Sequence, residues 1–116
     1  MSKVVAIHQP EHLPYPGFIG KILKSDLFVI LDHVPYRRRY YQNRNKIITR
    51  EGNEQWLILP IKKAAFDAPI NSIIISDDHK WQRDYLGRLE DAYKKTNNYL
   101  DFSPFIRRTI LGKEKN

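Results

Sequence analysis

The chain has 116 residues, enough for one modest hydrophobic core. It carries 20 Lys and Arg against 13 Asp and Glu, and this formal charge of +7 favours anionic partners without choosing among nucleic acid, nucleotide phosphate and acidic lipid. The absence of cysteine excludes disulfides, thiolate metal ligands and thiol catalysis. No apolar run approaches the ~20 residues of a membrane span. The N-terminal run is also too short for a signal peptide, so we expect a cytoplasmic protein.

The first third of the chain predicts a strand, a loop, a helix and a second strand. Residues 4–7 form a short apolar run typical of a buried strand, and the three prolines of residues 8–17 forbid a helix after it. A helix is expected from about Phe18, and residues 27–31 read as another buried strand. Parallel pairing of these strands would give a βαβ unit with a right-handed crossover.

The middle of the chain predicts further strands. Residues 46–49 and 55–61 flank a turn that contains Gly52, a pattern typical of a β-hairpin. Residues 70–76 are another strand candidate.

The last third of the chain is helical in its periodicity. An apolar stripe begins near Asp78, with Ser76 or Asp77 as the expected N-cap. The stripe consists of Trp81, Tyr85, Leu89 and Ala92 with Tyr93. A short final helix is expected to open at Ser103-Pro104 and to close at Gly112. We therefore expect a single α/β domain over residues 1–112, with a small mixed sheet, a hairpin and C-terminal helices, followed by a disordered tail at 113–116.

The loop after the first strand holds the first chemical constellation. His8, Glu11 and His12 match the H-x-x-E-H pattern of inverted zinc peptidases, which requires a helix to bring both histidines to one face. Pro10 blocks that helix, so we predict no structural or catalytic zinc. The same residues suit a rigid loop at a strand end, where His8 would act as acid, base or phosphate contact and Gln9 would offer its amide. Alternatively, the prolines only shape a connection.

Two further segments carry candidate chemistry. Asp32 directly follows the second apolar strand, which is a usual place for a catalytic or ribose-binding acid but equally for a residue that caps a turn. The segment 36–50 has six positive side chains and no acidic one, with tyrosines among its arginines. Such a pattern can grip phosphates and stack on bases, or it can form a solvated basic loop.

Four ordered blocks of sequence resemble the WbqC-like family. They are Gln9-Pro10-Glu11-His12-Leu13-Pro14-Tyr15-Pro16-Gly17-Phe18, Phe28-Val29-Ile30-Leu31-Asp32-His33-Val34-Pro35-Tyr36, Gln42-Asn43-Arg44-Asn45-Lys46-Ile47 and Trp56-Leu57-Ile58-Leu59-Pro60-Ile61. Some positions depart from the family pattern: the family has Tyr, Trp, a second Asp, Gln and Trp where this chain has His12, Tyr15, His33, Pro35 and Tyr41. Family members are typically about twice as long, so the resemblance implies that this chain corresponds to their N-terminal half.

The resemblance implies a transferase of surface polysaccharide (O-antigen) biosynthesis, with aminoacyl (glycine) or acyl transfer to a phosphorylated or nucleotide-linked sugar. An aminoacyl transfer needs a base that takes a proton from the attacking sugar amine or hydroxyl, and His8 or Asp32 is the predicted catalytic residue. The predicted substrate-binding residues are Gln9, Tyr15, Asn43 and Arg44, and no metal or cofactor is expected. We accordingly predict one pocket that gathers His8, Gln9, Asp32, Asn43 and Arg44. The alternative hypothesis is a nucleic-acid-binding module that uses the segment 36–50.

Overall fold

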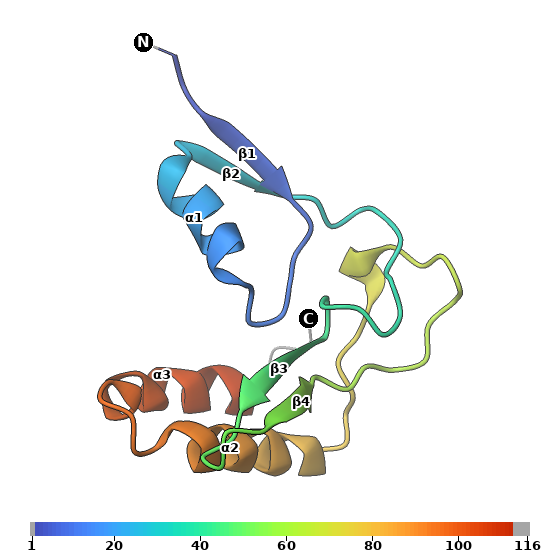
Figure 1. The fold of residues 1–116 in the computed structure, drawn as a ribbon. Coiled ribbons are helices and arrows are strands. Elements are labelled where there is room, and N and C mark those ends of the chain that lie inside the picture. The colour runs from blue at the N-terminus through green and yellow to red at the C-terminus, as the bar shows by residue number, and fades with distance from the viewer. Residues whose placement is uncertain (1, 113–116) are drawn as a thin grey trace. The chain divides into compact units, whose positions relative to one another are not determined.

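A computed structural model of the chain describes residues 2–112 (Figure 1). It contains short strands, three α-helices and one 3₁₀ helix, so the predicted small α/β fold is confirmed. The chain forms two compact units. Unit 1 comprises the described residues up to Asn45 together with Lys63–Ile73, and unit 2 comprises Lys46–Lys62 together with the described residues from Ile74 onward.

Unit 1 is built on a βαβ unit. Strands β1 (Val5–His8) and β2 (Leu27–Ile30) pair in parallel, and helix α1 (Pro16–Lys24) connects them, which gives the predicted βαβ unit. The prediction that both strands are buried is wrong, since Val5, Ile7 and Leu27 are each more than half exposed. The helix begins at a proline, which suits the first helical position because the N–H there needs no intrahelical acceptor. Phe18 is buried against the sheet, and its ring meets that of Phe28 edge-on at 5.3 Å.

In the remainder of unit 1, two extended segments that lie far apart in the sequence pair with each other. The Tyr36 N–H donates to the Ala68 carbonyl at 2.8 Å, and the Ile70 N–H donates to the Val34 carbonyl at 2.9 Å. The expected strand over residues 70–76 is wrong: a 3₁₀ helix, η1 (Ile70–Ser72), occupies its first half. The Ser72 hydroxyl donates to the Pro69 carbonyl at 2.7 Å, and such local bonds compete with a strand ladder.

Unit 2 contains the predicted hairpin. Strands β3 (Arg44–Ile48, of which residues 46–48 belong to this unit) and β4 (Glu54–Ile58) pair with each other across a turn in which Gly52 has φ of 85°. A left-handed residue of this kind favours glycine. The Lys46 ammonium pairs with the Glu54 carboxylate at 2.9 Å, but both side chains are exposed and the pair contributes little.

Helices α2 (Lys80–Tyr93) and α3 (Tyr99–Leu111) complete unit 2. The predicted apolar stripe of α2 is confirmed, since Tyr85 and Leu89 form one buried cluster with Ile47 and Leu57. Trp81, Ala92 and Tyr93 pack against this cluster.

Two helix boundaries differ from expectation. The N-cap of α2 is His79 rather than Ser76 or Asp77, because the Asp78 carboxylate already accepts the Lys80 N–H at 3.1 Å. Helix α3 begins well before Ser103 and carries Pro104 inside it. It extends toward its N-terminus because Tyr99, Ser103, Ile106 and Ile110 share one helical face, of which both isoleucines pack on the core.

Gly112 follows α3 as its C-cap, as predicted. The predicted tail at 113–116 lies outside the described residues. Within residues 2–112, none of the helices has both the length and the apolar character that crossing a bilayer requires.

Candidate functional site

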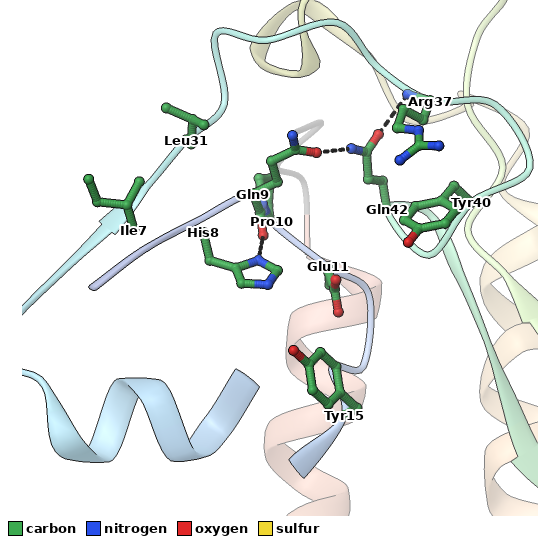
Figure 2. Close-up of a pocket in the computed structure, with 10 residues that line it drawn as sticks. All are labelled: Ile7, His8, Gln9, Pro10, Glu11, Tyr15, Leu31, Arg37, Tyr40 and Gln42. Atoms are coloured by element: carbon green, nitrogen blue, oxygen red, sulfur yellow. Dashed lines mark hydrogen bonds between the residues drawn. The ribbon is translucent and has the colours of Figure 1, made fainter. Parts of the chain in front are cut away.

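A cavity of about 490 Å³ lies in unit 1, where β1 passes into the loop that connects it to α1 (Figure 2). We call this connection, residues 9–15, the proline-rich loop. Its walls come from the carboxyl ends of both parallel strands, from the proline-rich loop and from the basic segment, residues 36–50. The lining residues are Ile7, His8, Gln9, Pro10, Glu11, Tyr15, Leu31, Arg37, Tyr40 and Gln42. The carboxyl edge of parallel strands is the usual position of a ligand site in α/β proteins.

His8 is the last residue of β1, and its imidazole is held in one orientation. Its Nδ1–H donates to the Gln9 carbonyl at 2.7 Å, and its ring meets Phe18 edge-on at 4.7 Å. A neutral imidazole that carries its proton on Nδ1 leaves Nε2 as a hydrogen-bond acceptor. Figure 2 shows Nε2 facing the space between Glu11 and Tyr15. The backbone bond therefore sets the tautomer that a general base requires.

A chain of hydrogen bonds joins the loop to the basic segment. The Gln42 Nε2 donates to the Gln9 Oε1 at 2.8 Å, and the Arg37 backbone N–H donates to the Gln42 Oε1 at 2.8 Å (Figure 2). Both glutamine amides are thereby fixed in orientation, and two walls of the cavity are tied to each other.

The basic wall of the cavity is formed by an arginine that stacks on an aromatic ring. The Arg37 guanidinium lies 4.4 Å from the centroid of the Tyr40 ring. The neighbouring Arg38 donates from Nη2 to the Ala64 carbonyl at 3.1 Å, which anchors this segment to the second stretch of unit 1. A guanidinium presents several donors in a planar fork, the geometry that suits phosphate and carboxylate groups.

Asn45 holds the proline-rich loop in place from β3. Its Nδ2 donates to the Leu13 carbonyl at 2.7 Å and to the His12 carbonyl at 3.3 Å. The His12 N–H in turn donates to the Tyr41 carbonyl at 2.8 Å. Leu13 has φ of 46°, so the loop passes through a strained conformation between its prolines. These bonds stabilise the bend that brings Tyr15 to the cavity.

The imidazole of His12 has a different environment from that of His8. Desolvation by burial lowers the pKa of His12 from 6.5 to about 4. The imidazole is therefore neutral at pH 7, and His12 belongs to the internal support of the loop rather than to the cavity wall.

Tyr15, the residue directly before α1, lines the cavity. A Cβ at Gly17 would collide with the Tyr15 ring, so this glycine is needed to leave the ring where it lies. Figure 2 shows the Tyr15 hydroxyl directed toward the part of the cavity that His8 and Glu11 face. Tyr15 therefore contributes an aromatic ring and a hydroxyl group to the lining of the cavity.

The predicted site residues fall into two groups. His8, Gln9 and Tyr15 line the cavity, whereas Asp32, Asn43 and Arg44 do not. The half-buried Asp32 follows β2, and its backbone carbonyl accepts the Asn71 N–H at 2.9 Å.

Asn43 and Arg44 make contacts inside unit 1. Asn43 is only 5% exposed, and its Oδ1 accepts a hydrogen bond from the Arg44 Nε at 3.2 Å. Arg44 also faces Tyr36: burial raises the pKa of the Tyr36 phenol, and the charge and hydrogen bond of Arg44 oppose that rise. The contact of Arg44 with Tyr36 joins the beginning of the basic segment to the start of β3.

Among the lining residues with polar side chains, four were not sequence-predicted site residues: Glu11, Arg37, Tyr40 and Gln42. A signal existed for Gln42, which opens the Gln-Asn-Arg-Asn block. Arg37 and Tyr40 belong to the basic, tyrosine-rich segment, but the sequence alone does not say which of its arginines turns toward the loop. Among residues 2–112, no group of three or more His, Asp or Glu side chains is arranged to hold a metal ion.

The fold and the cavity define the class: an α/β protein with a polar, partly cationic site at the carboxyl ends of its parallel strands. The chain belongs to the WbqC-like protein family, whose sequence model matches residues 9–116. It is 30% identical over 113 residues to the uncharacterized protein Rv1507c of Mycobacterium tuberculosis (strain ATCC 25618 / H37Rv), a match that covers 97% of this chain and 48% of that protein. The chain thus spans about half the length of this curated relative. No solved structure matches it significantly.

Proposed function

We propose that the chain binds a phosphorylated or nucleotide-linked sugar in the cavity of unit 1 and takes part in aminoacyl (glycine) or acyl transfer to that sugar, in the biosynthesis of a surface polysaccharide such as O-antigen. The observation that carries the proposal is one cavity lined by an oriented imidazole, His8, and by a guanidinium, Arg37. The imidazole suits proton removal, and the guanidinium suits the phosphate of the substrate.

The proposed roles follow from the geometry of the lining residues. The Nε2 of His8 takes the proton from the attacking amine or hydroxyl of the sugar, whose heteroatom forms the new bond to the acyl carbon while the donor's leaving group departs. Arg37 binds the phosphate, and Gln9 and Gln42 orient the ligand through their fixed amides. Tyr15 offers its ring to the base or the sugar.

Asp32 is retained as a second candidate base. It follows Leu31, which lines the cavity, so its carboxylate is close in sequence to the cavity wall. Asn43 and Arg44 are proposed to act on the substrate through the loops that they hold.

A thermal-shift panel tests the binding proposal, because a ligand that binds only the folded chain stabilises it by mass action. Nucleotide sugars and sugar phosphates should raise Tm in a concentration-dependent way, and the matched neutral sugars should not. The His8→Asn variant should keep this Tm shift while losing acyl transfer, since the imidazole acts on the proton rather than on the phosphate. Equal shifts with neutral sugars, or no shift with any phosphorylated ligand, would contradict the proposal.

Nucleic-acid binding through the segment 36–50 is the second candidate, favoured by its charge and its tyrosines. Two of the six cations of the segment already make internal contacts that the sugar site does not use: Arg38 with Ala64 and Lys46 with Glu54. This ranks the second candidate below the sugar site. Gel shifts at low salt with single-stranded RNA and DNA separate the two, because phosphate contacts lose affinity steeply as salt rises.

A further inference from the structure

The β1–β2 sheet has two faces with opposite surroundings. The parallel register places Val5 opposite Leu27 and Ile7 opposite Val29, so these four side chains share one face. The other face carries His8 and Phe28, both of which meet Phe18 of α1. Figure 1 shows α1 packed along the β1–β2 pair.

The face without α1 is apolar and exposed. Val5, Ile7, Leu27 and Val29 are 53%, 57%, 56% and 37% exposed. Parallel sheets in α/β proteins are normally covered on both faces, and a two-stranded sheet is at best marginally stable alone. Exposed apolar side chains that form a continuous patch mark an interaction surface. We call these four residues the open face.

The small size of the open face limits what can bind to it. A stable dimer interface needs about 800 Å² and ~20 residues per partner, far more than four side chains on two short strands provide. A second copy of this chain would therefore gain too little from this face alone. A segment that belongs to a larger folded polypeptide does not need so large an area at this one face, because the rest of that polypeptide makes further contacts.

The family supplies a body of the right size. This chain spans about half the length of the M. tuberculosis relative, which therefore carries a second half of comparable length. We propose that the open face docks an amphipathic helix from the polypeptide that forms this second half in the longer WbqC-like proteins. A helix on that side would give the sheet the two helical layers that parallel sheets require.

The chain contains no cysteine, so the reactivity of a single introduced cysteine shows directly how far its face is shielded from solvent. The test compares Ile7→Cys and Val29→Cys on the open face with Leu23→Cys on α1, where the leucine is 79% exposed. Each variant is co-expressed with the part of the M. tuberculosis relative that lies outside the matched region. The rate of thiol reaction with Ellman's reagent is then measured with and without that polypeptide, after circular dichroism has shown that the variants fold.

The proposal predicts that the added polypeptide slows the reaction of both open-face thiols at least tenfold and changes the Leu23→Cys rate less than twofold. Unchanged rates on the open face would overturn it. Protection that appears without the polypeptide would also overturn it. If that protection grows with concentration, the occupant is a second copy; if it does not, the chain's own unit 2 is the cover.

Discussion

His8 and His12 lie four residues apart in the same loop, yet their surroundings give them different chemistry. His8 presents one ring nitrogen to the cavity and fixes the other on a backbone carbonyl, as a general base requires. His12 is desolvated, and its pKa is lowered to about 4. Pro10 between them prevents the helix that would bring both rings to one side. The two histidines of the pattern that suggests a zinc peptidase are thus one cavity residue, His8, and one internal residue, His12.

The burial of His12 makes stability depend on pH in a defined window. The native imidazole gains its proton only near pH 4, whereas the unfolded imidazole gains it near 6.5. The unfolded state therefore binds more protons between these values, and the free energy of unfolding falls as pH falls from 6.5 to 4. A shift of this size corresponds to roughly 3 kcal/mol. Denaturant unfolding at several pH values should show this slope in the wild type and a much smaller slope in His12→Gln.

The matched control is His33→Gln, since the exposed His33 lies in the same unit. It should keep the wild-type slope between pH 6.5 and 4. Equal slopes in the wild type and His12→Gln would show that His12 is not desolvated in the native state.

At the scale of elements, the cavity depends on a loop that contains little regular structure of its own. Its prolines restrict the backbone, but its course is set by bonds from outside, above all by the Asn45 amide on the carbonyls of His12 and Leu13. A rigid loop held from a strand keeps ligand groups in place more precisely than a free loop would.

Removal of this amide should loosen the loop without removing a cavity residue. Asn45→Ala removes the donor of two hydrogen bonds to the loop, so we expect a loss of about 0.5–1.5 kcal/mol in the free energy of unfolding. Hydrogen–deuterium exchange should accelerate in peptides that cover residues 9–17. Asn71→Ala, at an exposed asparagine of unit 1, should change neither quantity by a comparable amount. Unchanged exchange in Asn45→Ala would mean that the prolines alone hold the loop.

The elements of the fold are largely readable from the sequence, because each follows a local rule. The apolar runs became β1 and β2, the glycine turn became a hairpin, and the stripe from Trp81 to Tyr93 became α2. The errors fall where tertiary contacts or local bonds prevail. Ser72 closes a 3₁₀ turn, and α3 begins at Tyr99 rather than at Ser103, along the helical face that packs on the core.

The site was less readable than the fold. His8 ends the first strand and Gln9 follows it directly, so their place at its carboxyl end can be predicted, and Tyr15 belongs to the loop that begins there. Arg37, Tyr40 and Gln42 reach the cavity through a hydrogen bond between residues 33 positions apart and through a local cation–π contact. No periodicity encodes such contacts.

At the scale of the whole molecule, the two units differ in the features that they contain. Unit 1 holds the cavity and the open face, and unit 2 holds the larger buried cluster around Leu57. The proposed ligand site is therefore a property of unit 1, and substitutions in its basic wall should change binding without altering the core of unit 2.

The most direct test of the ligand site is isothermal titration of a nucleotide sugar into the wild type, Arg37→Gln and Arg39→Gln. Both arginines are exposed neighbours, but only Arg37 lines the cavity. Loss of a hydrogen bond to a charged group costs about 1.5–3 kcal/mol, so Arg37→Gln should raise Kd roughly 10-fold to 150-fold. Arg39→Gln should leave Kd within twofold of the wild type. Equal Kd values for the wild type and Arg37→Gln, or equal losses in both variants, would contradict the assignment of the cavity as the phosphate-binding site.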